Sequence, residues 1–519
     1  MDAGVRAGSS TEAAALPIAD TTKKQVRGSS LLLAGRVISL LINFVVQVMI
    51  VRYLSKADFG AFAYALSIVT LGQTVITLGL NFAITRFTPI YEERKEYDKI
   101  FGTIVMATGT IVSLGLALVL LAFGLKGVLG GAIGGDDQAV TLLLIMIVLA
   151  PIQALDSLQT GMFAVFSKPR AIFFRKYLLA PSFRLVVVLL LVLSGSGVSF
   201  LAAGYVAAGA SGVAIYAVLL YREIERRGLL EHFHVRSMTM PWREVFAFTI
   251  PMLTTDLVYV VMNTSDAIIL GHYGGADEVG AFRVIWPLAQ MNLIVLTSFR
   301  FLYIPLAARF FAREDRAGLS DVYWGTAIWA AVLSFPIFAL TFSLAEPLTV
   351  TLYGERYADS SLYLALLSLG YYVQAASGHN GITLKVVGLL KYIVTINVLA
   401  AAVNLAINLA LIPVYGALGA AIGTCGTLLF HNVLKQWGLR RAGVTLFEWR
   451  YVRIFASILA AAAALLAIQV VASPTFVIAL LLATATSLAV LLVNRRALRL
   501  GHTFPELLRF KAIRLLIGE

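Results

Sequence analysis

The chain has 519 residues, of which 59% are hydrophobic and 13% charged, and its formal net charge is +13. This composition excludes an ordinary soluble domain, in which about a quarter of the residues are charged. It predicts an all-α polytopic membrane protein, because a helix needs about 20 mostly apolar residues to cross the hydrocarbon core of a bilayer.

We predict fourteen membrane-spanning helices between a tail at residues 1–27 and a tail at residues 494–519. The first tail lacks the apolar core and cleavage site of a signal peptide, so we expect it to be disordered and cytoplasmic. The second spaces leucines among arginines, which predicts an amphipathic helix in the headgroup layer, with a mobile basic tail as the alternative. The predicted helices are 28–51, 59–80, 100–124, 139–163, 177–194, 198–220, 244–270, 279–302, 321–345, 360–382, 392–413, 417–436, 452–472 and 475–493.

The loops between these helices alternate in charge. Cytoplasmic loops of membrane proteins are enriched in Lys and Arg, and alternate loops here hold nearly all of them. We therefore expect both termini in the cytoplasm, in the cytoplasmic (inner) membrane, and no nucleic-acid partner, because these loops account for the net charge. One cysteine, Cys425, leaves no disulfide framework or thiol metal site. The opposite loops hold only Arg52, Lys56, Lys126 and Arg356.

An internal repeat divides the chain. Three pairs of landmarks share an offset of 219 to 220 residues, which covers six predicted helices. An even number of helices makes the repeats parallel, so we expect a lobe at 28–220 and a lobe at 244–438 around a central cavity, as in secondary transporters. A cytoplasmic linker at 221–243 joins the lobes, and two further helices occupy 439–493. The paired landmarks are Asn43 with Asn263, Tyr53 with Tyr273, and Gly197 with Gly416.

Four stretches resemble a known family: RVISLLINF from Arg36, VRYLSKADFGAF from Val51, LGLNFAITRF from Leu78 and IPVYGALGAAIG from Ile412. They are similar to polysaccharide-biosynthesis and O-antigen-type flippases of the multidrug/oligosaccharidyl-lipid/polysaccharide exporter superfamily. The resemblance covers residues 28 to about 438 and indicates the superfamily better than the substrate. It implies that the chain is not an enzyme and flips a polyprenyl-diphosphate-linked oligosaccharide by alternating access. A glycan polymerase and glycosyltransferases are the expected protein partners.

The arginines inside predicted helices include Arg36, Arg184 and Arg283. A charge at the bilayer centre costs roughly 3 kcal/mol or more, so each should face protein or a water-filled cavity. Because the planar guanidinium suits phosphate oxygens, we predict that all three bind the substrate diphosphate. The resemblance also implies cavity arginines on the first and eighth helices. The alternatives are that Arg184 snorkels or pairs with Asp156, and that Arg283 lies near the outer interface.

Asp256 is an acid near the middle of the seventh helix, five residues after Pro251, which frees a backbone carbonyl. On the eleventh helix Asn404 and Asn408 are four residues apart and share a face, and Thr424 lies on the twelfth. The resemblance to the lipid II flippase branch implies a sodium site at these four positions, although Asn408 replaces an acid there. We expect no cofactor; if export is coupled to an ion, Na⁺ or H⁺ is the ion we expect. Interhelical hydrogen bonding is the alternative role.

Two other functions remain open from the sequence. A multidrug cation antiporter of the same superfamily would favour acidic cavity residues and usually has twelve helices. A membrane polymerase, ligase or glycosyltransferase needs a substantial external loop with acid–base residues, whereas the predicted external loop 125–138 has five glycines among its 14 residues.

Overall fold

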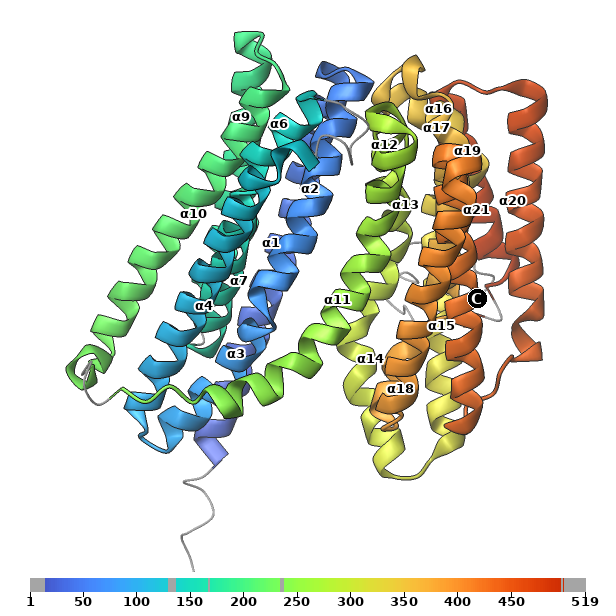
Figure 1. Cartoon of the computed structure of the whole chain (residues 1–519). Coiled ribbons are helices and arrows are strands. Elements are labelled where there is room, and N and C mark those ends of the chain that lie inside the picture. Colours follow the sequence, from blue (N-terminus) through green and yellow to red (C-terminus); the bar gives the residue numbers. More distant parts are fainter. Residues whose placement is uncertain (1–14, 129–136, 167–168, 234–237, 496–497, 499–519) are drawn as a thin grey trace, which may run out of the picture. The chain divides into compact units, whose positions relative to one another are not determined.

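The computed structural model describes residues 15–128, 137–166, 169–233, 238–495 and 498, and within them the chain is helical with no strand (Figure 1). The first helices are α1 (Ala15–Tyr53), α2 (Lys56–Thr77), α3 (Leu80–Glu93), α4 (Tyr97–Gly124), α6 (Asp137–Met146), α7 (Leu149–Val165), α8 (Pro169–Ile172), η1 (Phe173–Leu179), α9 (Ala180–Ser194), α10 (Val198–Arg226) and η2 (Leu229–His232). The later ones are α11 (Trp242–Tyr273), α12 (Gly275–Arg283), α13 (Trp286–Gln290), η3 (Met291–Leu293), α14 (Ile294–Ala312), α15 (Arg316–Phe338), η4 (Ala339–Ser343), α16 (Ala345–Tyr353), η5 (Glu355–Tyr357), α17 (Ser360–Ala376), α18 (Asn380–Val386), α19 (Leu390–Arg441), η6 (Trp449–Tyr451), α20 (Val452–Ala472) and α21 (Phe476–Val493).

The prediction of an all-α polytopic membrane protein is confirmed. Twelve helices in the described part of the chain are long and apolar enough to cross a membrane. The count of fourteen stays a prediction. One of the twelve, α19, runs for 52 residues and contains Gly416 in a non-helical conformation, between the eleventh and twelfth predicted helices. Another predicted span corresponds to α17, whose 17 residues make it shorter than any of the twelve. Of the predicted tails, residues 1–14 and most of 494–519 lie outside the described residues.

Contacts divide the chain into two compact units that do not coincide with the two sequence halves. The first unit comprises residues up to 50 together with 72–123 and 144–253. The second comprises residues 51–71, 124–143 and 254 onward. The predicted lobes and their parallel superposition stay predictions.

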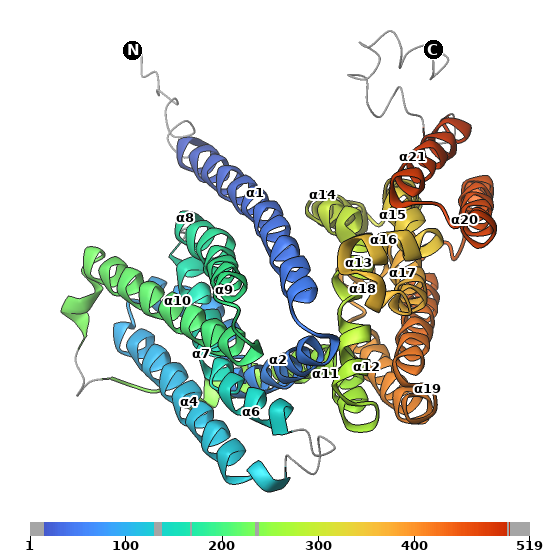
Figure 2. The same ribbon diagram turned by 90° about the horizontal axis from the view of Figure 1, so that it is seen from above.

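The first unit holds α3, α4, α7, α9 and α10, and α7 packs against both α3 and α10. Figure 2 shows α7 beside α10. In the second unit α20 and α21 pack on each other and on α15. Aromatic side chains fill this core: the rings of Phe338 and Tyr372 stack with their centroids 4.0 Å apart. The two C-terminal helices are therefore integral to the second unit.

Glycines allow α2 and α12 to cross at backbone distance in the second unit. A Cβ on Gly60 would lie 1.7 Å from the carbonyl oxygen of Ala276, and one on Gly280 would lie 2.4 Å from that of Lys56. Both neighbours are backbone atoms, which cannot move aside as a side chain can. Gly60 and Gly280 are 220 residues apart, which is the offset of the sequence repeat. In the structure the two glycines lie at the same helix crossing.

We expect Gly60→Ala to destabilise the protein by roughly 1–3 kcal/mol, because an added methyl group forces the crossing helices apart. Thermal unfolding of the purified chain in detergent measures the effect. The matched control is Gly109→Ala in α4, where a Cβ meets no atom within 4 Å. Equal unfolding temperatures for Gly60→Ala and the wild type would show that the crossing is not tightly packed.

Candidate functional site: a polar cavity in the first unit

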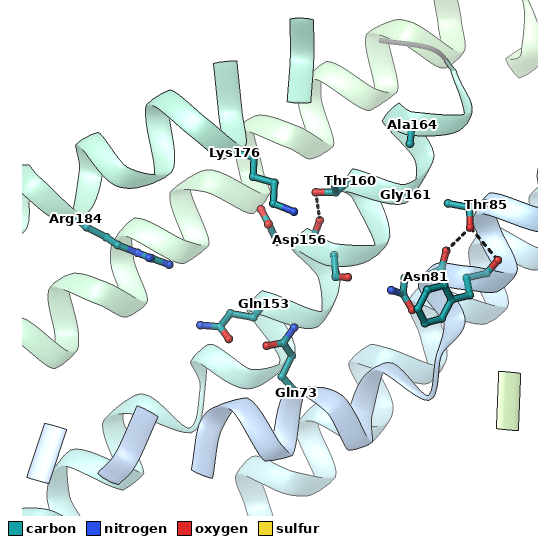
Figure 3. A pocket seen from close by; sticks show the side chains of 12 residues that line it. Gln73, Asn81, Thr85, Gln153, Asp156, Thr160, Gly161, Ala164, Lys176 and Arg184 are labelled. Atoms are coloured by element: carbon teal, nitrogen blue, oxygen red, sulfur yellow. Dashed lines mark hydrogen bonds between the residues drawn. The ribbon is translucent and has the colours of Figure 1, made fainter. Parts of the chain in front are cut away.

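The first unit contains a cavity of about 570 Å³ bounded by α2, α3, α7, η1 and α9 (Figure 3). Most of its lining is polar, although the helices around it belong to segments long and apolar enough to cross a membrane. The lining residues are Gln73, Asn81, Phe82, Thr85, Gln153, Asp156, Ser157, Thr160, Gly161, Ala164, Lys176 and Arg184.

Helix α7 contributes half of this lining from a single face. Its lining positions, from Gln153 to Ala164, recur at intervals of three and four residues, which places them on one side of an α-helix. On the opposite wall the chain breaks between α2 and α3 at Leu78 and Gly79, both with positive φ. The break re-aims the next turn, and the Asn81 side-chain oxygen is left buried with no hydrogen bond from any described residue. An acceptor buried at the cavity wall without a donor suits a hydroxyl-bearing ligand.

An ion pair joins Asp156, which lines the cavity, to the buried Arg175, which does not. The Arg175 side chain is only 5% exposed, and its Nη2 donates to Asp156 Oδ1 at 2.7 Å. Its Nε donates to the carbonyl oxygen of Gly212 on α10 at 3.0 Å, and its guanidinium lies 5.3 Å from the centre of the Tyr216 ring. A Cβ at Gly212 would lie 1.8 Å from Arg175 Nη2. The pair therefore ties η1 to both α7 and α10.

This pairing corrects two expectations. The sequence assigned Arg175 to a cytoplasmic loop, and it offered Arg184 as the partner of Asp156. Residues 173–179 instead form a π-helix, in which the hydrogen-bond spacing differs from that of an α-helix and side chains are rotated from their expected directions. The signals in the sequence were the acid Asp156 inside one predicted helix and two basic residues, Arg175 and Lys176, directly before the predicted helix 177–194.

Arg184 does line the cavity, as predicted for a substrate-binding arginine. Its Nη1 lies 3.4 Å from Asn43 Oδ1 of α1, and its guanidinium lies 5.6 Å from the centre of the Tyr205 ring. Lys176 adds a second, exposed cation to the lining. Since the carboxylate of Asp156 is paired with Arg175, the cavity wall carries a net positive charge.

Arg36 and Arg283 are not in this cavity. Arg36 is exposed on α1 and is absent from the lining. Arg283 belongs to the second unit, where its Nη2 lies 3.1 Å from Asp266 Oδ1 and 2.8 Å from the carbonyl oxygen of Asn263. Asp266 is fully buried. The shared cavity for Arg36 and Arg283 stays a prediction, because the two residues lie in different units.

Two of the four predicted ion-site residues, Asn404 and Asn408, form part of a buried polar cluster in the second unit. Asn408 Nδ2 lies 3.4 Å from Asn404 Oδ1, and Asn404 Nδ2 lies 3.4 Å from Thr427 Oγ1. Asn408 Oδ1 and Thr424 Oγ1 are both buried and have no hydrogen-bond partner among the described residues. The sequence missed Thr427, which lies three residues after Thr424 on the same helix.

Asp256 has no recorded contact with this cluster. The α11 residue that reaches it is Ser265, whose Oγ donates to Asn404 Oδ1 at 3.3 Å. Ser265 lies nine positions beyond Asp256, which is about 13 Å along an α-helix. The structure therefore brings Asn404 and Asn408 together and places a serine, not the predicted acid, beside them.

Two protein families match parts of this chain. The family described as "Polysaccharide biosynthesis protein" matches residues 25–311, which is more than half of the chain. The chain belongs to this family. A second family, MatE, matches residues 251–410 of the same chain. The resemblance to the multidrug/oligosaccharidyl-lipid/polysaccharide exporter superfamily is confirmed by the two matches together.

Individual relatives are distant. The succinoglycan biosynthesis transport protein ExoT of Rhizobium meliloti (strain 1021) is 24% identical over 334 residues. The aligned region covers 63% of the present chain and 62% of ExoT. The alignment thus spans less than two thirds of the relative. Among solved structures, the lipid II flippase MurJ in an inward closed conformation has a TM-score of 0.71 at 14% identity, covering 90% of this chain and 99% of MurJ. An inward-facing MATE multidrug transporter has a TM-score of 0.63 at 13% identity, covering 78% and 94%. At these identities the two structures establish a shared fold.

Proposed function

We propose that the chain is a secondary transporter that flips a polyprenyl-diphosphate-linked oligosaccharide across the cytoplasmic membrane, by alternating access. The observation that carries the proposal is the lining of the first-unit cavity. Amide and hydroxyl side chains such as Gln73, Gln153 and Ser157 can donate to and accept from sugar hydroxyls. Arg184 and Lys176 supply positive charge for phosphate oxygens. Membership of a polysaccharide-biosynthesis family and the name of ExoT support the same substrate class.

A multidrug cation antiporter is the second candidate, favoured by the MatE match at 251–410. A cationic drug needs an available carboxylate, and Asp156, the one carboxylate in the cavity lining, is paired with Arg175. The charge of the cavity therefore supports an anionic cargo.

Flipping in vesicles tests the proposal. The full chain is reconstituted with a fluorescent polyprenyl-diphosphate oligosaccharide, and the fraction of glycan accessible to a membrane-impermeant quencher is followed over time. We expect rapid equilibration between leaflets with the protein and none in empty vesicles. Transport of a cationic dye with no movement of the glycan would support the antiporter instead.

The same vesicles address coupling. No cofactor is proposed; Na⁺ or H⁺ is the proposed coupling ion, and the buried oxygens of Asn408 and Thr424 support a cation there. A gradient of the coupling ion should then accelerate uphill flipping. Asn408→Leu should abolish acceleration by a sodium gradient, and Asp256→Asn should abolish acceleration by a proton gradient carried by that separate carboxyl group. Gradient-independent flipping in all three proteins would leave the cluster with a packing role.

We also propose that both termini are cytoplasmic, where glycosyltransferases would supply the glycan, with a polymerase consuming it on the other side. The distribution of basic loops predicts that reporter fusions at residues 133 and 357 are external and those at 232 and 445 cytoplasmic. Fusions to alkaline phosphatase and to a fluorescent protein at each position measure this. Any position reporting from the unexpected side would require a different set of spans.

A further inference from the structure

A group of cations without a carboxylate partner lies at one end of the second unit. Helices α14, α18 and α19 pack together there (Figure 1). They carry Arg300, Lys385 and Lys435, respectively. The stretch 360–447, which includes all of α18 and α19, contains no Asp or Glu, and neither does α14. These cations therefore have no acid on the elements that hold them.

The packing brings the two lysines to one side. A Cβ on Gly381 of α18 would lie 3.7 Å from Lys435 Cε, so the lysine stem runs along that face of α18. Lys385 is four residues after Gly381 and lies on the same face. The two ammonium groups repel each other, and Lys435 is partly buried with no hydrogen bond or ion pair among the described residues. Two like charges held together at a partly buried site favour a bound anion.

A histidine adds a second, independent observation. His379 precedes α18, is 4% exposed, and its Nε2 is buried with no hydrogen-bond partner among the described residues. Its ring packs on Tyr303 of α14, with centroids 4.6 Å apart, and the charge of Arg300, one turn earlier on α14, acts on it. A buried ring nitrogen without a partner is costly unless a ligand or water occupies it. It lies where α14 and α18 meet, two residues before Gly381, the glycine against which the Lys435 side chain packs.

We propose that Arg300, Lys385 and Lys435, with His379, form a second binding site that takes a lipid-borne phosphate group. The site is separate from the first-unit cavity and does not depend on the proposed glycan transport. Each of these side chains can donate a hydrogen bond to a phosphate oxygen, and the charge of the phosphate would replace the missing carboxylates. The phosphate could belong to a polyprenyl diphosphate or to an anionic phospholipid, which share this chemistry.

Amine labelling of the intact wild-type chain in detergent tests the site. Labelling of Lys435, read by mass spectrometry, is measured with inorganic pyrophosphate, a polyprenyl diphosphate or phosphatidylglycerol. At ten times its Kd a ligand occupies about nine tenths of the sites, so we expect labelling of Lys435 to fall about ten-fold. Labelling of Lys95, an exposed lysine between α3 and α4, should not change. Protection by one lipid but not the other identifies the source of the phosphate, and unchanged Lys435 labelling with all three probes overturns the proposal.

Binding to variants gives an independent measurement. We expect Lys385→Gln and Lys435→Gln each to weaken binding of the protecting probe at least ten-fold, roughly the effect of losing one charge-assisted hydrogen bond. Lys95→Gln should bind as the wild type does. Equal affinity in all four proteins would overturn the site, and if a variant fails to fold, the labelling of the wild-type chain decides.

Discussion

Arg184→Ala is expected to reduce glycan export by about 10- to 100-fold, the equivalent of roughly 1.5–3 kcal/mol for a hydrogen bond to a charged group. Arg184 lines the first-unit cavity, and its side chain is also within reach of Asn43 and Tyr205. Removing it leaves Lys176 as the one basic residue in the lining. Arg184→Lys should restore part of the activity, because it keeps the charge but loses the planar fork that fits phosphate.

Flipping in vesicles and export in cells measure this effect, each normalised to the amount of folded protein. The control is Arg222→Ala, which removes an exposed arginine of α10 that does not line the cavity. Wild-type export by a stably inserted Arg184→Ala variant would exclude the cavity as the phosphate-binding site.

Asp156→Ala is expected to lower the free energy of unfolding by about 3–5 kcal/mol. It leaves the Arg175 guanidinium buried on η1 with the carbonyl of Gly212 as its remaining recorded hydrogen-bond acceptor. The cost of an uncompensated buried cation exceeds the net value of the pair itself. Removing both charges in Asp156→Ala/Arg175→Met should therefore recover most of the loss, since methionine fills similar space without a charge.

A double-mutant cycle on thermal unfolding in detergent separates these terms. The cycle should give a coupling energy of at least about 2 kcal/mol, a large fraction of the destabilisation expected for the single variant. Thr160→Ala on the same face of α7 is the control, since Thr160 bonds the backbone of its own helix. If the double variant were as unstable as Asp156→Ala alone, the contact would not be an energetically coupled pair.

The activity of the double variant shows whether Asp156 contacts the cargo as well as pairing with Arg175. Asp156 is part of the cavity lining, whereas Arg175 is not. A double variant that is stable but inactive would show that the exposed edge of Asp156 also contacts the cargo. A double variant that is stable and active would confine the pair to a supporting role.

The sequence by itself determined the fold class and the family. The fold class follows from the length of the apolar stretches, a one-dimensional pattern that the bilayer imposes. The family follows from the resemblance of short stretches such as VRYLSKADFGAF from Val51. The sequence also singled out Gly416, Asn404 and Asn408. A helix break and an i,i+4 spacing are local patterns that can be seen in the sequence. Arg184 could be identified as a cavity residue from the cost of its charge alone.

Only the tertiary structure decided which side chains meet. Arg175 pairs with Asp156 because a π-helical turn changes the direction in which its side chain points, which no hydropathy pattern records. Ser265, rather than Asp256, contacts Asn404, because the relative axial positions of α11 and α19 are set by packing between residues 139 positions apart. Arg283 is engaged by a fully buried Asp266 for the same reason. A hydrophobic pattern fixes which segments are helices, but the rotation and height of each helix against its neighbours depend on the shapes of all the side chains between them.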